Sequence, residues 1–392
     1  MKKTLRLLPL ITVLAALTMF SQGCKKEDKT TEAPAAKAAL SATEIVLGAV
    51  FPMTGPIATY GQESVNGMKM ALKKVGNVVG LPIRLIVEDN KGEPVESANA
   101  VKKLINVDNV HLIVGSVASS NTLAGAPIAQ QARVPLMTPA STNETVTQTG
   151  NFISRTCFTD AFQGVVMAKF AYESLKKKKA IIIVDNSSDY SKGLAAVFKK
   201  KFVELGGTVI DGTFTYVQKD TDFRSLLRKV KREGPDVVWL PGYYTEVGLM
   251  LNQARQMGMN LPFLGGDGWD SPKLQELAGA DGIKGNYISS HFSPDDEDPM
   301  VQGFVKEYVA TYGQKPGAMA ALGYDGVLVV ADALKRAGTL THKSISEAIN
   351  STKDFVGITG SITIDENRNA RKAAVVLETT ATGMKFKQKV MP

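Results

Sequence analysis

The sequence predicts an α/β protein with two Rossmann-like lobes, each built on a mostly parallel sheet wrapped by helices. From Glu44 onward, short runs rich in β-branched residues alternate with amphipathic helical stretches, as in parallel sheets with helices on their faces. This alternation occurs in two successive sets, each about the size of a domain. The chain has 392 residues, 44% of them hydrophobic and 21% charged, which is enough material for two cores.

The first 23 residues have the charge, length and position of an export signal. Lys2, Lys3 and Arg6 precede the apolar run 7–20, which is shorter than a typical membrane-spanning helix. No later segment offers about 18 uncharged apolar residues. We therefore predict that residues 1–23 are a signal peptide and that the rest of the chain is soluble.

The residues around Cys24 favour a lipid anchor. The segment Ser21-Gln22-Gly23-Cys24 resembles the lipobox of bacterial lipoproteins, in which the Cys is acylated, although that motif has Leu and a small residue in place of Ser21 and Gln22. Residues 24–43 are rich in Lys, Glu, Thr, Ala and Pro, cannot bury a core and are predicted to form a flexible tether. The expected location is the periplasm or cell surface, on a membrane. The alternative is a secreted protein cut nearby, without an acylated Cys24.

Cysteine usage and charge exclude several classes of protein. If Cys24 carries lipid, Cys157 has no disulfide partner and is predicted to be an inert buried thiol. The formal net charge of +8 falls to +5 when the three cations of the signal leave. Its densest cluster, 176–179, follows a predicted helix end, where cations face water. Basic residues interleaved with aromatics and a helix-turn-helix pattern are both missing, so no nucleic-acid binding is expected.

The sequence shows no catalytic or metal-binding motif. His111, His291 and His342 stand far apart, with no carboxylate or Cys at ligand spacing, so no metal site is predicted. Phosphate-cradling, dinucleotide-binding and esterase motifs are missing as well. We therefore expect no cofactor and no enzymatic activity.

The elements of the first set follow from hydrophobic spacing, with apolar residues at helical intervals between β-branched runs. Its predicted strands are Ile45–Val50, Ile83–Glu88, His111–Val114 and Val134–Met137, and its helices are Gln62–Val75 and Pro94–Asn106. The second set has predicted strands at Ala180–Val184, Thr208–Phe214, Asp236–Leu240 and Pro262–Leu264, with helices at Tyr190–Leu205, Asp222–Glu233 and Thr245–Met257.

The remaining segments are shared between the lobes. Predicted helices 299–312 and 317–337 pack on the first lobe, and the last strands, Ser361–Ile364 and Ala373–Glu378, return to the second. The chain then crosses three times between lobes, with crossings near Thr159–Phe162 and Ser289–Ser293. The predicted domains are lobe 1, residues 44–160 plus 290–360, and lobe 2, residues 161–289 plus 361–392. A cleft between such lobes is where ligands bind.

Two loops rich in small and polar residues follow strands of the first set, where open parallel sheets present ligand groups. In the loop 115–122, Ser119 precedes a helical run, so its hydroxyl and nearby backbone N–H groups can hold an anion at a helix N-terminus. A capping role for Ser119 is an equal alternative. The loop 138–143 offers the Ala140 carbonyl and the Thr142 hydroxyl.

Three further candidates follow strands of the second set. Tyr190 and Tyr243 stand at strand exits, although single tyrosines are more often packing residues. Asp267 lies among glycines directly after an apolar strand, and glycines allow close backbone approach while the acid attracts a cation. Asp189 is better explained as a helix N-cap.

Taken in order, these motifs resemble the periplasmic leucine/isoleucine/valine-binding proteins, which have the type I periplasmic-binding fold. The resemblance runs from about Glu44 to the last strands. Its motifs are Gly48–Pro56 with Tyr60-Gly61, the Gly115 loop, Thr138–Thr142, Asp189–Gly193 and Gly265–Gly268. It implies the solute-binding component of an ABC transporter, a monomer that binds a free amino acid, branched-chain or otherwise aliphatic, and delivers it to a permease.

The resemblance also implies roles for single residues. Ser119, Ala140 and Thr142 match positions that bind the α-carboxylate and part of the α-ammonium of the ligand. Tyr190 and Tyr243 match positions that close over the ligand from the second lobe. Asp267 matches a position usually held by a Glu that pairs with the ammonium. The positions that line the side-chain pocket correspond to Tyr60, Val117, Ala118 and Met319.

Other ligands and classes remain to be weighed. The same scaffold serves amides, urea and aromatic acids, and such ligands lack the ammonium that would need Asp267. A receptor ectodomain of this fold would need a membrane span, and an enzyme would need a nucleophile or a metal that the sequence does not assemble.

Overall fold

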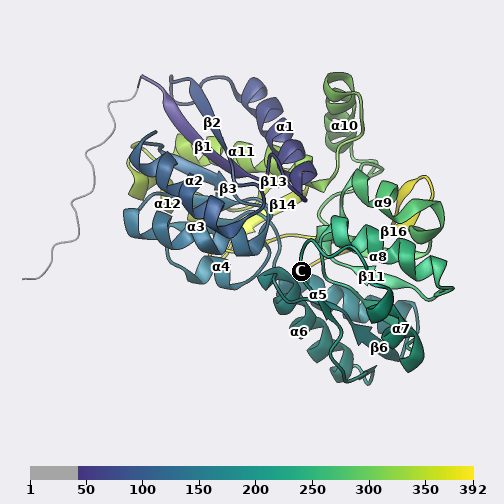
Figure 1. Cartoon of the computed structure of the whole chain (residues 1–392). Coiled ribbons are helices and arrows are strands. Elements are labelled where there is room, and N and C mark those ends of the chain that lie inside the picture. The colour runs from purple at the N-terminus through teal and green to yellow at the C-terminus, as the bar shows by residue number, and fades with distance from the viewer. Residues whose placement is uncertain (1–42) are drawn as a thin grey trace, which may run out of the picture. The chain divides into compact units, whose positions relative to one another are not determined.

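Two separate sheets organise residues 43–392, the part of the chain that this computed structural model describes (Figure 1). The five-stranded sheet has the order β2-β1-β3-β4-β5 and is parallel throughout. The seven-stranded sheet has the order β17-β16-β12-β11-β10-β6-β8, parallel from β12 to β8 and antiparallel at β16 and β17. We call the parts built on them lobe 1 and lobe 2. The predicted α/β class with two lobes is confirmed.

Lobe 1 begins with five strands and four helices. They are β1 (Ile45–Phe51), α1 (Ala58–Val75), β2 (Ile83–Asp89), α2 (Pro94–Asn106), β3 (Leu112–Gly115), α3 (Ser119–Ala132), β4 (Leu136–Thr138), α4 (Thr145–Gln148) and β5 (Ile153–Arg155). The interior strand β1, which pairs with β2 and β3, is buried throughout. Leu47 and Ala49 belong to the core cluster that contains α1 residues, while Val46 and Val50 join α2 and α3 in a second cluster. Helices therefore cover both faces of this sheet, which explains why β1 is apolar on both sides.

Lobe 2 repeats this arrangement with shorter strands. Its elements are α5 (Asp160–Lys169), a π turn (Phe170–Ser174), β6 (Lys179–Ile182), β7 (Val184–Asp185), α6 (Asp189–Glu204), β8 (Thr208–Val209), β9 (Thr215–Tyr216), α7 (Arg224–Glu233), β10 (Val237–Trp239), α8 (Tyr244–Gln256), β11 (Phe263–Gly265), the 3-10 turn η2 (Asp267–Trp269), α9 (Pro272–Gly282) and β12 (Asn286–Ser290). Two later strands, β16 (Ala374–Thr380) and β17 (Gly383–Val390), complete its sheet.

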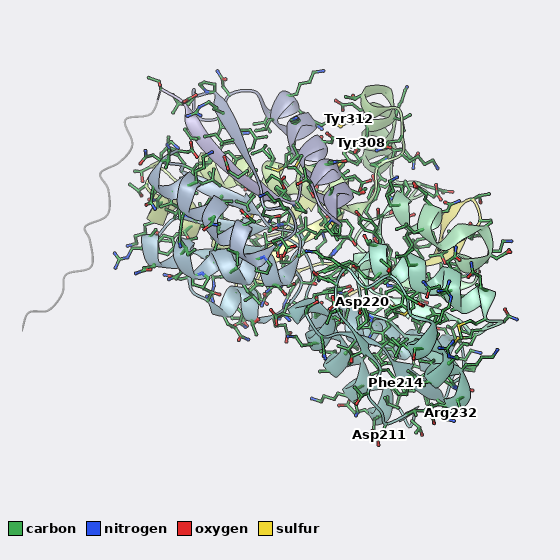
Figure 2. The ribbon with its side chains drawn as sticks, in the orientation of Figure 1. Asp211, Phe214, Asp220, Arg232, Tyr308 and Tyr312 are labelled. Atoms are coloured by element: carbon green, nitrogen blue, oxygen red, sulfur yellow. The ribbon has the colours of Figure 1, made fainter. Side chains whose placement is uncertain are left out.

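The predicted strand Thr208–Phe214 is wrong beyond Val209. The chain leaves the sheet at Asp211, whose side chain is 96% exposed, and bends at Gly212, whose φ of 153° side-chain-bearing residues rarely adopt. Phe214 then turns back into the core, and β9 pairs with β7 outside the main sheet. Figure 2 labels Asp211 and Phe214 at this edge of lobe 2.

The chain returns to lobe 1 after β12. It forms α10 (Pro299–Tyr312), α11 (Ala318–Arg336) and α12 (His342–Asn350), followed by the small antiparallel sheet of β13 (Phe355–Gly357), β14 (Gly360–Ile364) and β15 (Ala370–Arg371). Helix α11 packs against α1, and α12 against α11 and β5. The chain therefore crosses between lobes before α5, after β12 and between β15 and β16.

The structure differs from the expectation that Ser361–Ile364 joins lobe 2. This segment is β14, which pairs with β13 and β15. The physical reason lies on α11, where the Asp325 carboxylate accepts the N–H groups of Ile358 and Thr359 and so holds the β13–β14 hairpin on lobe 1. The other expected return is confirmed, since β16 pairs with β12. The residue bounds of the lobes stay a prediction.

The predicted signal peptide, the acylation site Cys24 and all of the predicted tether except Thr43 lie outside the described residues. Within residues 43–392, no helix combines the length and the apolar character needed to cross a membrane.

Helices α1 and α11 approach closely at two glycines. A Cβ added at Gly67 would lie 1.9 Å from the Ala320 carbonyl oxygen, and one at Gly323 would lie 2.2 Å from the Ser64 carbonyl oxygen. Since overpacking typically destabilises a core by about 1 to 3 kcal/mol, we expect Gly67→Ala to lower the free energy of unfolding in urea by at least about 2 kcal/mol. The control is Gly303→Ala on α10, where a Cβ would meet nothing within 4 Å. Equal stability of both variants would contradict the close helix contact.

Candidate functional site

The ten predicted ligand-binding residues are all buried, and none is more than 5% exposed. The loops after β3 and β4 bring Ser119 and Thr142 to the carboxyl edge of the lobe 1 sheet. On lobe 2, the loops after β7, β10 and β11 carry Tyr190, Tyr243 and Asp267 at the carboxyl ends of their strands. This edge is where open α/β sheets bind ligands. The residues concerned are Tyr60, Val117, Ala118, Ser119, Ala140, Thr142, Tyr190, Tyr243, Asp267 and Met319.

The two lobes touch through direct polar and aromatic contacts. The Tyr60 hydroxyl on α1 donates to the carbonyl oxygen of Gly268. Its ring meets those of Tyr244 and Tyr243 edge-on, with centroids 4.9 and 6.1 Å apart. The Asp189 N–H donates to Ser120 Oγ at 3.0 Å, across the same boundary. These contacts describe a closed arrangement of the lobes around the predicted ligand site.

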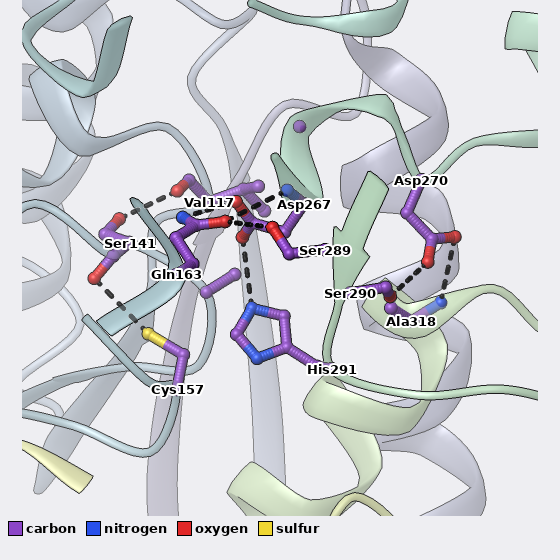
Figure 3. A network of polar contacts seen from close by, with 12 residues as sticks. Val117, Ser141, Cys157, Gln163, Asp267, Asp270, Ser289, Ser290, His291 and Ala318 are labelled. Carbon is purple, nitrogen blue, oxygen red and sulfur yellow. Dashed lines mark hydrogen bonds and ion pairs between the residues drawn. The ribbon is translucent and has the colours of Figure 1, made fainter. Parts of the chain in front are cut away.

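Asp267 has a polar partner on each carboxylate oxygen (Figure 3). Its Oδ1 accepts from Gln163 Nε2 at 2.9 Å and from the Tyr190 hydroxyl at 3.0 Å, and its Oδ2 lies 3.0 Å from His291 Nε2. The Tyr190 ring stacks on that of Tyr243, with centroids 5.3 Å apart and planes 12° apart. Tyr190 therefore hydrogen-bonds Asp267, and Tyr243 packs on the Tyr190 ring. Tyr190 is thus more than the packing residue that a single tyrosine usually is.

A second acid, Asp160, lies beside Asp267 and was missed by sequence reasoning. Gln163 Nε2 donates to Oδ1 of both carboxylates, at 2.9 Å each. The Asp160 N–H donates to the Thr142 carbonyl oxygen at 2.9 Å, and Asp160 Oδ2 has no hydrogen-bond partner. Burial raises the pKa of Asp160 to about 7, and the charge of Asp267 adds to the rise. The sequence did hold one signal for this residue, because Asp160 is an acid within the predicted crossing Thr159–Phe162.

The second crossing supplies His291 and Ser289. The His291 ring stacks on Phe158 at 3.6 Å between centroids, and burial lowers the pKa of the imidazole. A neutral ring that serves the Asp267 carboxylate must carry its proton on Nε2. The Ser289 hydroxyl donates to Gln163 Oε1 at 2.9 Å and so orients the amide. In the sequence, His291 was considered only as a metal ligand, and no metal site was predicted. In the structure, His291 positions Asp267.

A fully buried arginine holds the lobe 1 loop that follows β4. Arg155 Nη1 and Nη2 donate to the carbonyl oxygens of Ser141 and Asn143, each at 2.6 Å. Cys157 Sγ donates to the same Ser141 oxygen at 3.3 Å. This thiol is free and buried, and burial raises its pKa to about 12, so it stays protonated. Arg155 and Cys157 therefore fix the loop that carries Ala140 and Thr142.

Two capping interpretations change with the structure. Ala118, with no side-chain cap, precedes α3, and Ser119 Oγ instead accepts the Asn143 N–H at 3.2 Å. The N-cap of α6 is Ser188, whose hydroxyl accepts the Ser191 N–H, so the capping role expected of Asp189 is wrong. Ser119 therefore ties the two lobe 1 loops together, which leaves ligand contact by Ser119 a prediction.

Known proteins share this sequence and architecture. Residues 44–383 match the model of a family described as periplasmic binding protein. A leucine-, isoleucine-, valine-, threonine- and alanine-binding protein of Pseudomonas aeruginosa is 30% identical over 332 residues, which cover 83% of this chain and 87% of that protein. A leucine-binding protein of Thermotoga maritima has 39% identity and a TM-score of 0.86, covering 89% of this chain and 99% of its own.

A third similar protein has been solved with a ligand. It is a branched-chain amino acid transporter substrate-binding protein of Streptococcus pneumoniae in complex with isoleucine, with 33% identity, a TM-score of 0.84 and coverage of 89% of this chain and 100% of its own. The matched residues include the five-stranded sheet, the seven-stranded sheet up to the start of β17, and every loop of the site described above. The chain belongs to the periplasmic binding protein family.

Proposed function

We propose that this chain is the solute-binding component of an ABC transporter, and that it binds a free aliphatic amino acid between its lobes. The observation that carries the proposal is the buried Asp267 of lobe 2. Gln163 joins its carboxylate to that of Asp160, whose N–H donates to the Thr142 carbonyl oxygen in the lobe 1 loop. A zwitterion presents opposite charges to the two sides of such a cleft. Relatives named for leucine, isoleucine and valine support the same ligand class.

The lobe 1 loops receive the carboxylate end of the ligand. Ser119 and Thr142 offer hydroxyl groups at the carboxyl edge of a parallel sheet, next to the N-terminus of α3, where the helix dipole favours an anion. The Ala140 carbonyl is an acceptor for the ammonium. Closing of the lobes adds the Tyr190 and Tyr243 rings and creates the shape that a permease recognises.

Asp267 receives the ammonium, and Asp160 stands behind it. An Asp is one methylene shorter than the Glu usual at this position, so the ammonium is reached through water or lies deeper in the cleft. Tyr60, Val117, Ala118 and Met319 surround the aliphatic side chain. Hydrogen bonds to charged groups contribute about 1.5 to 3 kcal/mol each, so a few of them with apolar burial reach the roughly 8 kcal/mol of a micromolar site.

The proposal includes export and membrane attachment. Residues 1–23 direct export, Cys24 carries the lipid, and the protein acts as a monomer on the periplasmic side or cell surface, next to its permease. We propose no catalytic activity.

A thermal-shift screen tests the ligand class. The chain from Glu44 is mixed with aliphatic amino acids, amides, urea and aromatic acids, because a ligand that binds only the folded protein stabilises it by about 2.7 kcal/mol at a hundred times its Kd. We expect the largest rise in Tm with leucine, isoleucine or valine. Stabilisation only by compounds without an ammonium would contradict the role of Asp267 and favour the amide, urea or aromatic-acid alternative.

A further inference from the structure

A second pair of carboxyl groups lies across the lobe boundary, outside the predicted ligand set. Glu63 stands one helical turn after Tyr60 on α1, and Asp270 follows η2 on lobe 2. A Cβ placed on Gly317, just before α11, would lie 2.7 Å from Glu63 Oε2 and 3.3 Å from Asp270 Oδ1. The two acids therefore converge on one point, and both are buried.

The two acids differ in their hydrogen bonds. Asp270 accepts from the Ser290 hydroxyl at 2.5 Å and from the Ala318 N–H at 3.4 Å (Figure 3). Neither oxygen of Glu63 has a hydrogen-bond partner, although the residue is only 2% exposed. An unpaired buried carboxylate is strongly unfavourable. A carboxylic acid is instead itself a donor, and Asp270 is an acceptor on the opposite lobe.

The groups around the pair offer no counter-charge. Tyr244 on α8 and Tyr308 on α10 lie close enough to Glu63 for its charge to add to the rise that burial causes in the pKa of each phenol. Asp267 likewise adds to the rise that burial causes in the pKa of Asp270. Figure 2 labels Tyr308 on α10. Among residues 43–392, no lysine or arginine is a cause of the pKa shift of either acid.

We propose that Glu63 and Asp270 form a proton-binding site shared by the two lobes, so that closure of the cleft takes up a proton. When the lobes separate, Glu63 no longer lies next to Asp270 and becomes exposed to water. The inference rests on the proposed function in one respect, because amino-acid binding is what drives closure in the test.

The sign of the pH dependence follows from burial. Burial, reinforced by the charge of Asp270, raises the pKa of Glu63 to about 8, and the nearby Gly317 backbone opposes this only in part. An acid whose pKa is raised in the closed form stabilises that form fully below its open-state pKa. The contribution disappears as the pH rises through the closed-state value. Ligand affinity should therefore fall between pH 6 and pH 8, by up to about 50-fold for one linked proton.

Titration calorimetry with L-leucine measures this linkage. Binding is compared at pH 7 in two buffers of different ionisation enthalpy, and the Kd is followed from pH 6 to pH 8, for the wild type and Glu63→Gln. We expect proton uptake by the wild type, a smaller uptake by the variant and a flatter Kd profile. Asp160, whose pKa is also raised, acts equally in both proteins. Glu347→Gln, at an exposed position on α12, is the control and should match the wild type.

A second measurement follows the stability of the closed form. The urea midpoint of the protein saturated with L-leucine is followed from pH 6 to pH 9 for the wild type and Glu63→Gln, and the wild type should lose stability relative to the variant as the pH rises. Parallel profiles in the presence of L-leucine would overturn the proton site.

The remaining outcomes separate the two proposals. Binding of L-leucine with equal proton uptake in both proteins leaves the proposed function standing and overturns the proton site. No binding at any pH counts against the proposed function and, because no ligand then drives closure, against the proton site as well. A wild-type affinity that depends on Na⁺ or K⁺ but not on a large organic cation would place a metal cation between the acids and overturn the proton.

Discussion

Asp267→Ala is expected to weaken amino-acid binding by about 2 to 5 kcal/mol, because it leaves the ligand ammonium buried without its counter-charge. This loss corresponds to a Kd increase from about 30-fold to several thousand-fold. The structure adds a reason for the size of the effect. The carboxylate oxygens of Asp267 contact Gln163, Tyr190 and His291. The orientation of these three side chains therefore depends on Asp267.

Calorimetry with matched variants separates charge from shape. Asp267→Asn keeps the volume and loses the charge, so it should bind nearly as weakly as the alanine variant. Asp267→Glu restores the residue usual in the resembled proteins and should retain binding. An unchanged affinity in Asp267→Ala would contradict the assignment. A larger loss in Asp160→Asn than in Asp267→Asn would place the ammonium on Asp160.

The binding loops could be predicted from sequence because their signals are local. A run of β-branched residues ending in Gly115 or Gly265 marks the end of a strand and the loop after it in one short stretch. In each lobe, the parallel strands then bring such loops to the carboxyl edge of that lobe's sheet. Ser119 and Thr142 therefore lie at the carboxyl edge of the lobe 1 sheet, and Asp267 at the carboxyl edge of the lobe 2 sheet, as the order of strands requires.

The roles of Gln163 and His291 could not be predicted, because one residue lies just after the first crossing between lobes and the other lies in the second. Gln163 and His291 are 128 positions apart by their numbers, and no local pattern links them. Only the tertiary fold brings both to Asp267. Glu63 likewise sits on an amphipathic helix, where its buried position is visible only once α11 packs against α1.

The misplaced strand has a similar cause. The residues of β14 favour any strand partner, because β-propensity describes fit to a pleated surface and not the choice of sheet. Asp325 decides the partner by holding the preceding turn on α11. Nothing in the sequence links a helical Asp to a turn 33 residues later.

This same acid leads to the largest stability effect that we expect. The buried Asp325 carboxylate accepts from the Ile358 N–H at 2.7 Å, the Thr359 N–H at 2.8 Å and the Thr359 hydroxyl at 2.6 Å. Lys372, buried in the third crossing, donates to the Thr359 hydroxyl oxygen. Burial lowers the pKa of Lys372 to about 8, although the charge of Asp325 opposes part of this fall. One acid thus joins α11, the β13–β14 turn and the crossing.

Asp325→Ala should therefore lower the free energy of unfolding by about 3 to 5 kcal/mol, because it leaves three donors without an acceptor and Lys372 without its counter-charge. Urea denaturation measures the loss, and Asp325→Asn, which retains one acceptor oxygen, should fall between the wild type and the alanine variant. Asp332→Ala on the same helix is the control, since its exposed pair with Arg336 contributes at most about 1 kcal/mol. If both alanine variants unfold at the same urea concentration, Asp325 does not hold the third crossing to lobe 1.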